Sequence, residues 1–308
     1  MGKLLRSAFT VLVAGMVMVT GLSNPSKAEA SSKIGAETKK AIVVVSFGTT
    51  FPESRKACIE SVENKIQQSF PDYEVRRAFT STIVVKRIQE NENIHIDSLE
   101  QALDKLKQEG FSEVIVQTTH LTPGEEYDKK VVAVVAKYGQ AFDKIVIGRP
   151  VLYFHGENGQ PDDFAAVVKA LRSQMPLLQK PDRAVVFMGH GSPHQPNPAY
   201  GALQERFDAA GLNVVVGVVE ESDHPNFEDV KKALEDRKIK KVVLMPLMLV
   251  AGDHANNDMA GDESDSWKNQ LIDEGLQVET YIHGLGENPA FQDIYVQHVR
   301  DAISGIHQ

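Results

Sequence analysis

The sequence has a single cysteine, Cys58, among 308 residues. One thiol cannot form a disulfide within the chain, so a disulfide-stabilised scaffold is excluded. Basic residues are outnumbered, with 33 Lys and Arg against 42 Asp and Glu and a formal net charge of -9. This balance argues against a general attraction to nucleic acid or to an anionic membrane, so we expect no nucleic-acid partner. An anionic substrate must therefore meet a local basic patch.

An uninterrupted membrane-spanning run and a basic stop-transfer cluster are both missing, although the N-terminus is apolar. Lys3 and Arg6 precede an apolar stretch over about residues 8–22, and Ala28-Glu29-Ala30 supplies the small residues that signal peptidase accepts. This pattern predicts a cleaved signal peptide over residues 1–30 and a periplasmic protein. A membrane anchor is the alternative. A lipoprotein is disfavoured because no cysteine lies near the cleavage point.

The rest of the chain alternates apolar strands with helices, and it does so twice. Continuous runs of Val, Ile and Leu are typical of parallel strands covered on both faces, and the alternation predicts right-handed crossovers. We therefore expect an α/β protein made of two similar three-layer α/β/α domains with mostly parallel sheets, whose strand ends face one cleft. The expected parts are a first domain over 31–155, a connecting helical segment over 156–183, and a second domain over 184–308 that includes a terminal helix.

Two histidines follow the ends of predicted strands in the second domain. His190 follows AVVFMG, and His254 follows the long apolar run that begins at Lys241. Glu220 ends the strand NVVVGVVE in the same way. Ligands of open α/β sheets bind at the carboxyl ends of the strands, so these three side chains predict a shared site for a metal or a proton.

The types of these three residues narrow the choice of metal ion. Two imidazoles and a carboxylate suit Co(II), Fe(II), Ni(II) or Zn(II) better than Mg(II) or Ca(II). The close helical spacing of HExxH is missing, so the ligands must come from separate strands. The GHG around His190 is similar to a motif of the phosphohistidine phosphatases, but there an arginine precedes the histidine, whereas Met188 and Gly189 precede it here, which counts against that chemistry.

Several longer motifs resemble the anaerobic sirohydrochlorin cobaltochelatases, which belong to the class II tetrapyrrole chelatases and are related to ferrochelatase. The most specific is LMPLMLVAGDHANNDMAGDESDSWK with GLGENPA, and VVVSFGTT, RRAFTS, HLTPGEEY, FMGHGS and VGVVE support it. The resemblance covers nearly all of the chain after residue 40. It implies two α/β domains with the tetrapyrrole bound between them, and a lyase that inserts Co(II) into sirohydrochlorin for cobalamin biosynthesis.

The resemblance places the catalytic and metal-binding histidines of the family on His190 and His254, and the metal-binding glutamate on Glu220. Neutral imidazole can bind a metal and also accept the pyrrole protons that metal insertion releases. No organic cofactor is required. The signal peptide departs from a family that is usually cytoplasmic, so a periplasmic haem-binding or metal-binding protein, or an iron-inserting one, remains the alternative.

Sirohydrochlorin carries eight carboxylates, which require cations in the substrate site. Arg76 and Arg77 are the candidates, because they stand near the end of a predicted strand and guanidinium binds carboxylate through two hydrogen bonds. His120 ends another strand and is a further substrate-binding candidate or an axial ligand to a bound tetrapyrrole. The sequence decides neither the physiological metal among Co(II), Fe(II) and Ni(II), nor whether haem binds, nor whether a homo-oligomer forms.

Overall fold

The computed structural model describes residues 38–175, 180–193 and 196–306, so the expected signal peptide lies outside the described residues. The first four strands form one parallel sheet in the order β2-β1-β3-β4. They are β1 (Lys40–Ser46), β2 (Glu74–Phe79), β3 (Glu113–Thr118) and β4 (Lys144–Gly148). The apolar runs of β1 and β3 are buried on both faces, as continuous runs of Val and Ile predict.

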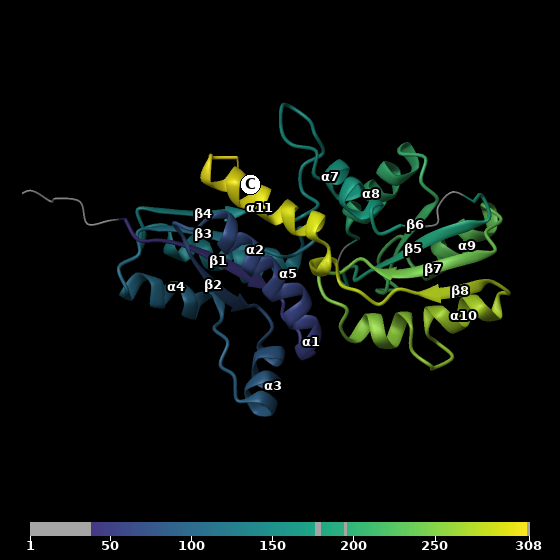
Figure 1. Cartoon of the computed structure of the whole chain (residues 1–308), viewed down its shortest axis with the longest axis horizontal. Helices are drawn as coiled ribbons and strands as arrows, with labels where there is room; N and C mark the ends of the chain where they lie inside the picture. Colours follow the sequence, from purple (N-terminus) through teal and green to yellow (C-terminus); the bar gives the residue numbers. More distant parts are fainter. Residues whose placement is uncertain (1–37, 176–179, 194–195, 307–308) are drawn as a thin grey trace, which may run out of the picture. The chain divides into compact units, whose positions relative to one another are not determined.

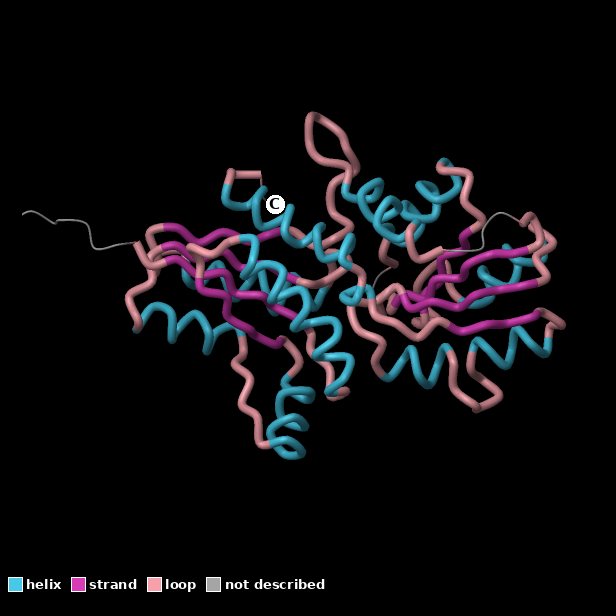
Figure 2. The backbone as a smooth tube through the Cα atoms, in the orientation of Figure 1, coloured by secondary structure: helices cyan, strands magenta, loops and turns pink. Residues whose placement is uncertain are grey.

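The next four strands repeat this arrangement in a second parallel sheet, in the order β6-β5-β7-β8. They are β5 (Arg183–Gly189), β6 (Val214–Val218), β7 (Lys241–Pro246) and β8 (Gln277–Thr280). Figures 1 and 2 show the two sets of strands as separate sheets. The prediction of two similar α/β halves with parallel sheets is confirmed.

Helices connect the strands of each sheet. In the first half they are α1 (Pro52–Ser54), η1 (Arg55–Glu60), α2 (Ser61–Ser69), α3 (Thr82–Glu92), α4 (Leu99–Gln108), α5 (Glu125–Tyr127), η2 (Asp128–Val132), α6 (Ala133–Val135) and η3 (Ala136–Tyr138). Those that follow are α7 (Asp163–Arg172), α8 (Pro198–Ala209), α9 (Phe227–Asp236), η4 (Ala255–Met259), α10 (Trp267–Asp273), η5 (Leu285–Glu287) and α11 (Pro289–Ile303). The segments η1, η2 and η4 are π-helical turns.

The terminal helix α11 follows the second half in sequence but packs on the first. It contacts α2, β3 and β4, and it also contacts α7. Asn288 caps its first turn by accepting a hydrogen bond from the backbone of Ala290, and Pro289 occupies the first helical position. The helix therefore ties the two halves together, and Figure 1 shows it beside β4 and α2.

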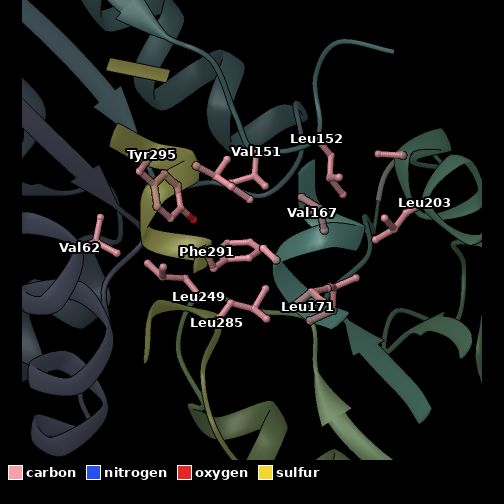
Figure 3. Packing of buried hydrophobic residues seen from close by; sticks show 14 of the residues in the cluster. Val62, Val151, Leu152, Val167, Leu171, Leu203, Leu249, Leu285, Phe291 and Tyr295 are labelled. Carbon is pink, nitrogen blue, oxygen red and sulfur yellow. The ribbon is translucent and has the colours of Figure 1, made fainter. Parts of the chain in front are cut away.

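Three hydrophobic clusters fill the structure. One lies under α4 and the α5–η3 segment on one face of the first sheet, and another lies under α9 and α10 on the second sheet. The largest is shared by the remaining faces of both sheets, with Phe291 and Tyr295 of α11 among residues such as Leu171 and Leu203. Figure 3 shows Phe291 between Tyr295 on one side and Leu171 on the other. Among the described residues, no helix combines the length and the apolar character that crossing a membrane requires.

Candidate active site

The two predicted histidines come together. His190 is exposed directly after β5, and His254 is half-buried in the loop after β7, where it immediately precedes η4. The centres of their imidazole rings are 4.8 Å apart, with the ring planes nearly perpendicular. Because β5 and β7 are adjacent parallel strands, their carboxyl ends deliver both rings to one edge of the second sheet.

The hydrogen bonds of the two rings determine which nitrogen is free. Nδ1 of His190 lies 3.1 Å from the carbonyl oxygen of Gly191, and Nδ1 of His254 lies 2.6 Å from a carboxylate oxygen of Asp258. Carbonyl and carboxylate oxygens only accept, so each Nδ1 donates a proton in these bonds. Nε2 is therefore the nitrogen that each neutral ring has free for a metal or a proton.

Glu220 lies beside the turn that carries His190. Its backbone amide donates to the carbonyl oxygen of His190 over 3.1 Å. Gly191 has a φ of +83°, and a β-carbon at this position would lie 2.9 Å from the β-carbon of Glu220. Glycine is therefore required for both its positive φ and its lack of a side chain. The carboxylate of Glu220 is half-buried and has no ion pair among the described residues.

A buried carboxylate organises the loop after His190. Asp223 is completely buried, and its oxygens accept hydrogen bonds from the backbone amides of Ser192, Asn197 and His224 over 2.8–2.9 Å. The hydroxyl of Tyr200 also accepts from the amide of Gly191. These hydrogen bonds link the turn that carries His190 to the loop after β6, which carries Glu220.

Loops of the first half contact these turns directly. The hydroxyl of Ser54 donates to the carbonyl oxygen of Ala251 over 2.9 Å, three residues before His254. The side-chain amide of Asn197 donates to the hydroxyl of Thr122 over 2.9 Å. Helix α1, which follows β1, and the loop after β3 therefore contact the loops that follow β7 and β5.

The structure brings together two of the three expected metal ligands as a pair. Within residues 38–175, 180–193 and 196–306, no group of three or more His, Cys, Asp or Glu side chains is arranged to hold a metal ion. Glu220 adjoins the His190 turn through the hydrogen bond from its backbone amide.

Arg76 and Arg77 do not stand at the end of β2, and that placement was wrong. They occupy the third and fourth of its six positions, opposite Val43 and Val44 of β1. Both guanidinium groups are paired with glutamates: Arg76 with Glu74 and Glu109, and Arg77 with Glu60 and Glu63. The strand continues through Ala78 and Phe79, so its carboxyl end lies beyond the two arginines. The charges of both arginines are already balanced by these glutamates.

His120 follows β3 as expected, but its ring is engaged inside the protein. Nδ1 lies 2.6 Å from the hydroxyl of Thr118, and Nε2 is enclosed without a hydrogen-bond partner among the described residues. Burial lowers the pKa of His120 from 6.5 to about 4, because the charged imidazolium loses its hydration. The ring is therefore neutral at pH 7.

This pKa predicts a stability change in mild acid. The unfolded chain takes up the proton near pH 6.5, whereas folded His120 resists it until about pH 4. The stabilisation from His120 is therefore complete above pH 6.5 and is lost as the pH falls to about 4, by roughly 3 kcal/mol in total. We expect His120→Gln to lose correspondingly less stability than the wild type between pH 7 and pH 4.5 in urea unfolding. His95→Gln, a change at an exposed histidine, is the control, and a curve for His120→Gln that runs parallel to the wild type would contradict the assignment.

The sequence did not indicate several residues that shape the site. Asp258 stands four residues after His254, a spacing that brings side chains together on a helical turn and that could have been noticed. Asp223 and Asn197 carry no comparable signal, because their roles depend on loops that meet only in the folded chain.

A duplicated α/β fold that presents paired imidazoles at the carboxyl ends of its strands defines a protein of the class II chelatase type. Solved structures agree on the fold. SirB from Bacillus subtilis with Fe3+ superimposes with a TM-score of 0.59 at 18% identity, covering 86% of this chain and 96% of that one. The cobalt complex of the sirohydrochlorin chelatase SirB from Bacillus subtilis subspecies spizizenii gives 0.57 at 15% identity, covering 87% and 97%.

Sequence comparison identifies the family. Residues 40–304 match the family described as cobalt chelatase (CbiK). The sirohydrochlorin cobaltochelatase of Salmonella typhimurium is 38% identical over 266 residues, covering 86% of this chain and 97% of the relative. The sirohydrochlorin cobaltochelatase CbiKC of Nitratidesulfovibrio vulgaris is 33% identical over 270 residues, covering 87% and 92%. The chain belongs to the CbiK cobalt chelatase family, as the motifs predicted.

Proposed function

We propose that this protein inserts Co(II) into sirohydrochlorin. The observation that carries the proposal is the pair of imidazoles, His190 and His254, with ring centres 4.8 Å apart at the strand ends of a CbiK-family chain. Histidine nitrogens bind first-row divalent ions at about 2 Å, so two rings at this separation can share one ion. Cobalt is a substrate of the reaction and leaves in the product.

The chemistry assigned to each residue follows from its free atoms. Metal insertion removes two protons from the pyrrole nitrogens, and the macrocycle nitrogens then replace the protein ligands around the metal. Nε2 of His190 and of His254 bind the incoming ion and accept these protons as the ion is transferred. Glu220 supplies a carboxylate that completes the ligand set and offsets the positive charge of the ion. Loop contacts from the first half hold the turns in place while this exchange occurs.

The carboxylates of the substrate need a cation that is not already paired. Arg87 on α3 is exposed and has no ion pair among the described residues, in contrast to Arg76 and Arg77. Ile83 stands four residues earlier on the same helix and is 64% exposed. Residues at this spacing share a helix face, so α3 offers an apolar surface next to a free guanidinium. We assign this face to the macrocycle and its carboxylate edge, with Arg76 and Arg77 as secondary candidates whose ion pairs must first open.

An insertion assay tests the proposed function. Purified protein beginning at Ser31 is mixed with sirohydrochlorin and Co(II), and the absorbance change of the macrocycle is followed against the spontaneous reaction. We expect a clear acceleration with Co(II), and parallel assays with Fe(II) and Ni(II) rank the metals. No acceleration with any of the three would contradict the proposal and would favour a haem-binding or metal-binding role.

We also propose that the protein is exported to the periplasm. The basic residues, the apolar stretch and Ala28-Glu29-Ala30 support cleavage after Ala30. When the full chain is expressed in a Gram-negative host, the mature protein is expected in the periplasmic fraction with Ser31 as its first residue. Fractionation, intact mass and N-terminal sequencing measure this, with a form lacking residues 2–30 as the cytoplasmic control. An uncleaved chain in the membrane fraction would instead indicate an anchor.

A further inference from the structure

Several acidic residues lie close to His254 in the segment that follows β7, and Asp258 is the one that hydrogen-bonds its imidazole. The carboxylate of Asp258 lies 2.6 Å from Nδ1 of His254. Nearby acids have other partners: Asp253 accepts from the side chain of Asn257, and Asp262 accepts from Lys268. Of the acids described in this loop, Asp258 alone contacts the imidazole.

The turn that carries Asp258 is anchored to the rest of the second half. Asp258 belongs to the π-helical turn η4, whose Ala255 and Met259 are completely buried. The side-chain amide of Asn256 donates to the carbonyl oxygens of Ala251 and Gly252, which joins the turn to the loop that precedes it. The carboxylate is therefore held at a fixed position relative to the ring. π-Helical turns of this kind are frequent at functional sites.

We propose that Asp258 is a positioning residue that holds His254 in the tautomer with the proton on Nδ1 and so directs Nε2 to the incoming cobalt ion. A carboxylate accepts and cannot donate, so the contact requires Nδ1 to carry the proton. Removal of such a carboxylate partner from a metal-binding histidine typically weakens metal binding about 10–100-fold. The Nδ1 partner of His190 is only a backbone carbonyl oxygen, at 3.1 Å, whereas that of His254 is a carboxylate. The two histidines therefore differ in how strongly their tautomer is held. The role in metal delivery depends on the proposed chelatase function, whereas the tautomer does not.

The tautomer can be measured without turnover. Metal-free protein labelled with 15N-histidine is studied at pH 8 by long-range proton–nitrogen correlation, which distinguishes the two tautomers of each ring. We expect His254 of the wild type to carry its proton on Nδ1, and Asp258→Ala to lose this preference. Asp258→Asn retains an acceptor oxygen and is expected to keep most of it. Asp258 is about half exposed, so these changes leave the fold intact.

Kinetics measure the consequence for cobalt. In Asp258→Ala the KM for Co(II) is expected to rise about 10–100-fold, with a smaller change in kcat at saturating metal. Asp253→Ala removes the same charge from the same loop but leaves the imidazole contact, so its KM should stay within about fivefold of the wild type. Equal effects of Asp253→Ala and Asp258→Ala would overturn the proposal in favour of a general charge effect.

The measurements distinguish the positioning role of Asp258 from the chelatase function. If Asp258→Ala keeps both the wild-type tautomer and the wild-type KM, the positioning role is wrong and the chelatase function stands. If the tautomer changes as expected but no form of the protein inserts cobalt, the function is wrong and the positioning of His254 stands.

Discussion

Replacing His190 or His254 with alanine is expected to slow cobalt insertion into sirohydrochlorin at least about 100-fold. Each ring offers one free Nε2, and the two rings stand 4.8 Å apart, so either change leaves a single imidazole to bind the ion and accept protons. The loss should be similar for the single and double variants, because the two rings act as one unit. Initial rates at saturating metal and tetrapyrrole measure the effect.

The fold should survive these changes. His190 is exposed and His254 is about one-third exposed, so truncation opens no cavity, and the free energy of unfolding should change by less than about 1 kcal/mol. His95→Ala is the matched control, because His95 is an exposed histidine of the other half, paired with Asp97. A rate within a few-fold of the wild type for either site variant would remove that histidine from the mechanism.

Replacing Arg149 with methionine is expected to lower the free energy of unfolding by about 3–5 kcal/mol. Arg149 follows β4 and is 1% exposed. Its guanidinium makes two hydrogen bonds of 2.8 Å to Asp163 on α7 and an ion pair of 2.9 Å to Asp301 on α11. His298 of α11 contacts both the backbone of Arg149 and the carboxylate of Asp163. Methionine fills a similar volume but leaves two buried carboxylates without their cation.

Arg149 helps to keep the buried carboxyl group of Asp163 ionised. Burial by itself raises the pKa of Asp163, but hydrogen bonds from Arg149 and His298 outweigh it and hold the pKa below its usual range. The stabilisation from this ionised carboxylate is therefore present above the pKa of an unfolded aspartate and is lost as the pH falls through the lower folded value.

Urea unfolding at pH 7 measures the loss in Arg149→Met. Arg76→Met is the matched control, because Arg76 forms ion pairs near the surface with Glu74 and Glu109, and it should cost no more than about 1 kcal/mol. If Arg149→Met unfolds at the same urea concentration as Arg76→Met, the buried network does not hold α11 against the first half.

The sequence predicted seven of the eight strands and their repetition, because most of them are nearly continuous apolar runs, although β2 carries Arg76 and Arg77 in its middle. It missed β8, whose QVET has one half-buried residue among exposed ones and lies at the sheet edge. It also left open where α11 packs. The apolar stripe of that helix fits either half, and the choice depends on buried partners such as Arg149 and Asp163, which are far apart in sequence.

Local sequence signals were enough to predict the parallel α/β class, the duplication, the family and the candidates His190 and His254. These follow from local signals, since an apolar run, a glycine turn and the residue that follows it are adjacent in the chain. The folded chain was needed to show that the two rings meet edge to face, that Nε2 is the free nitrogen of both, and that Arg76 and Arg77 are already paired. Such relations depend on distances between separate strands and loops, which spacing along a chain does not fix.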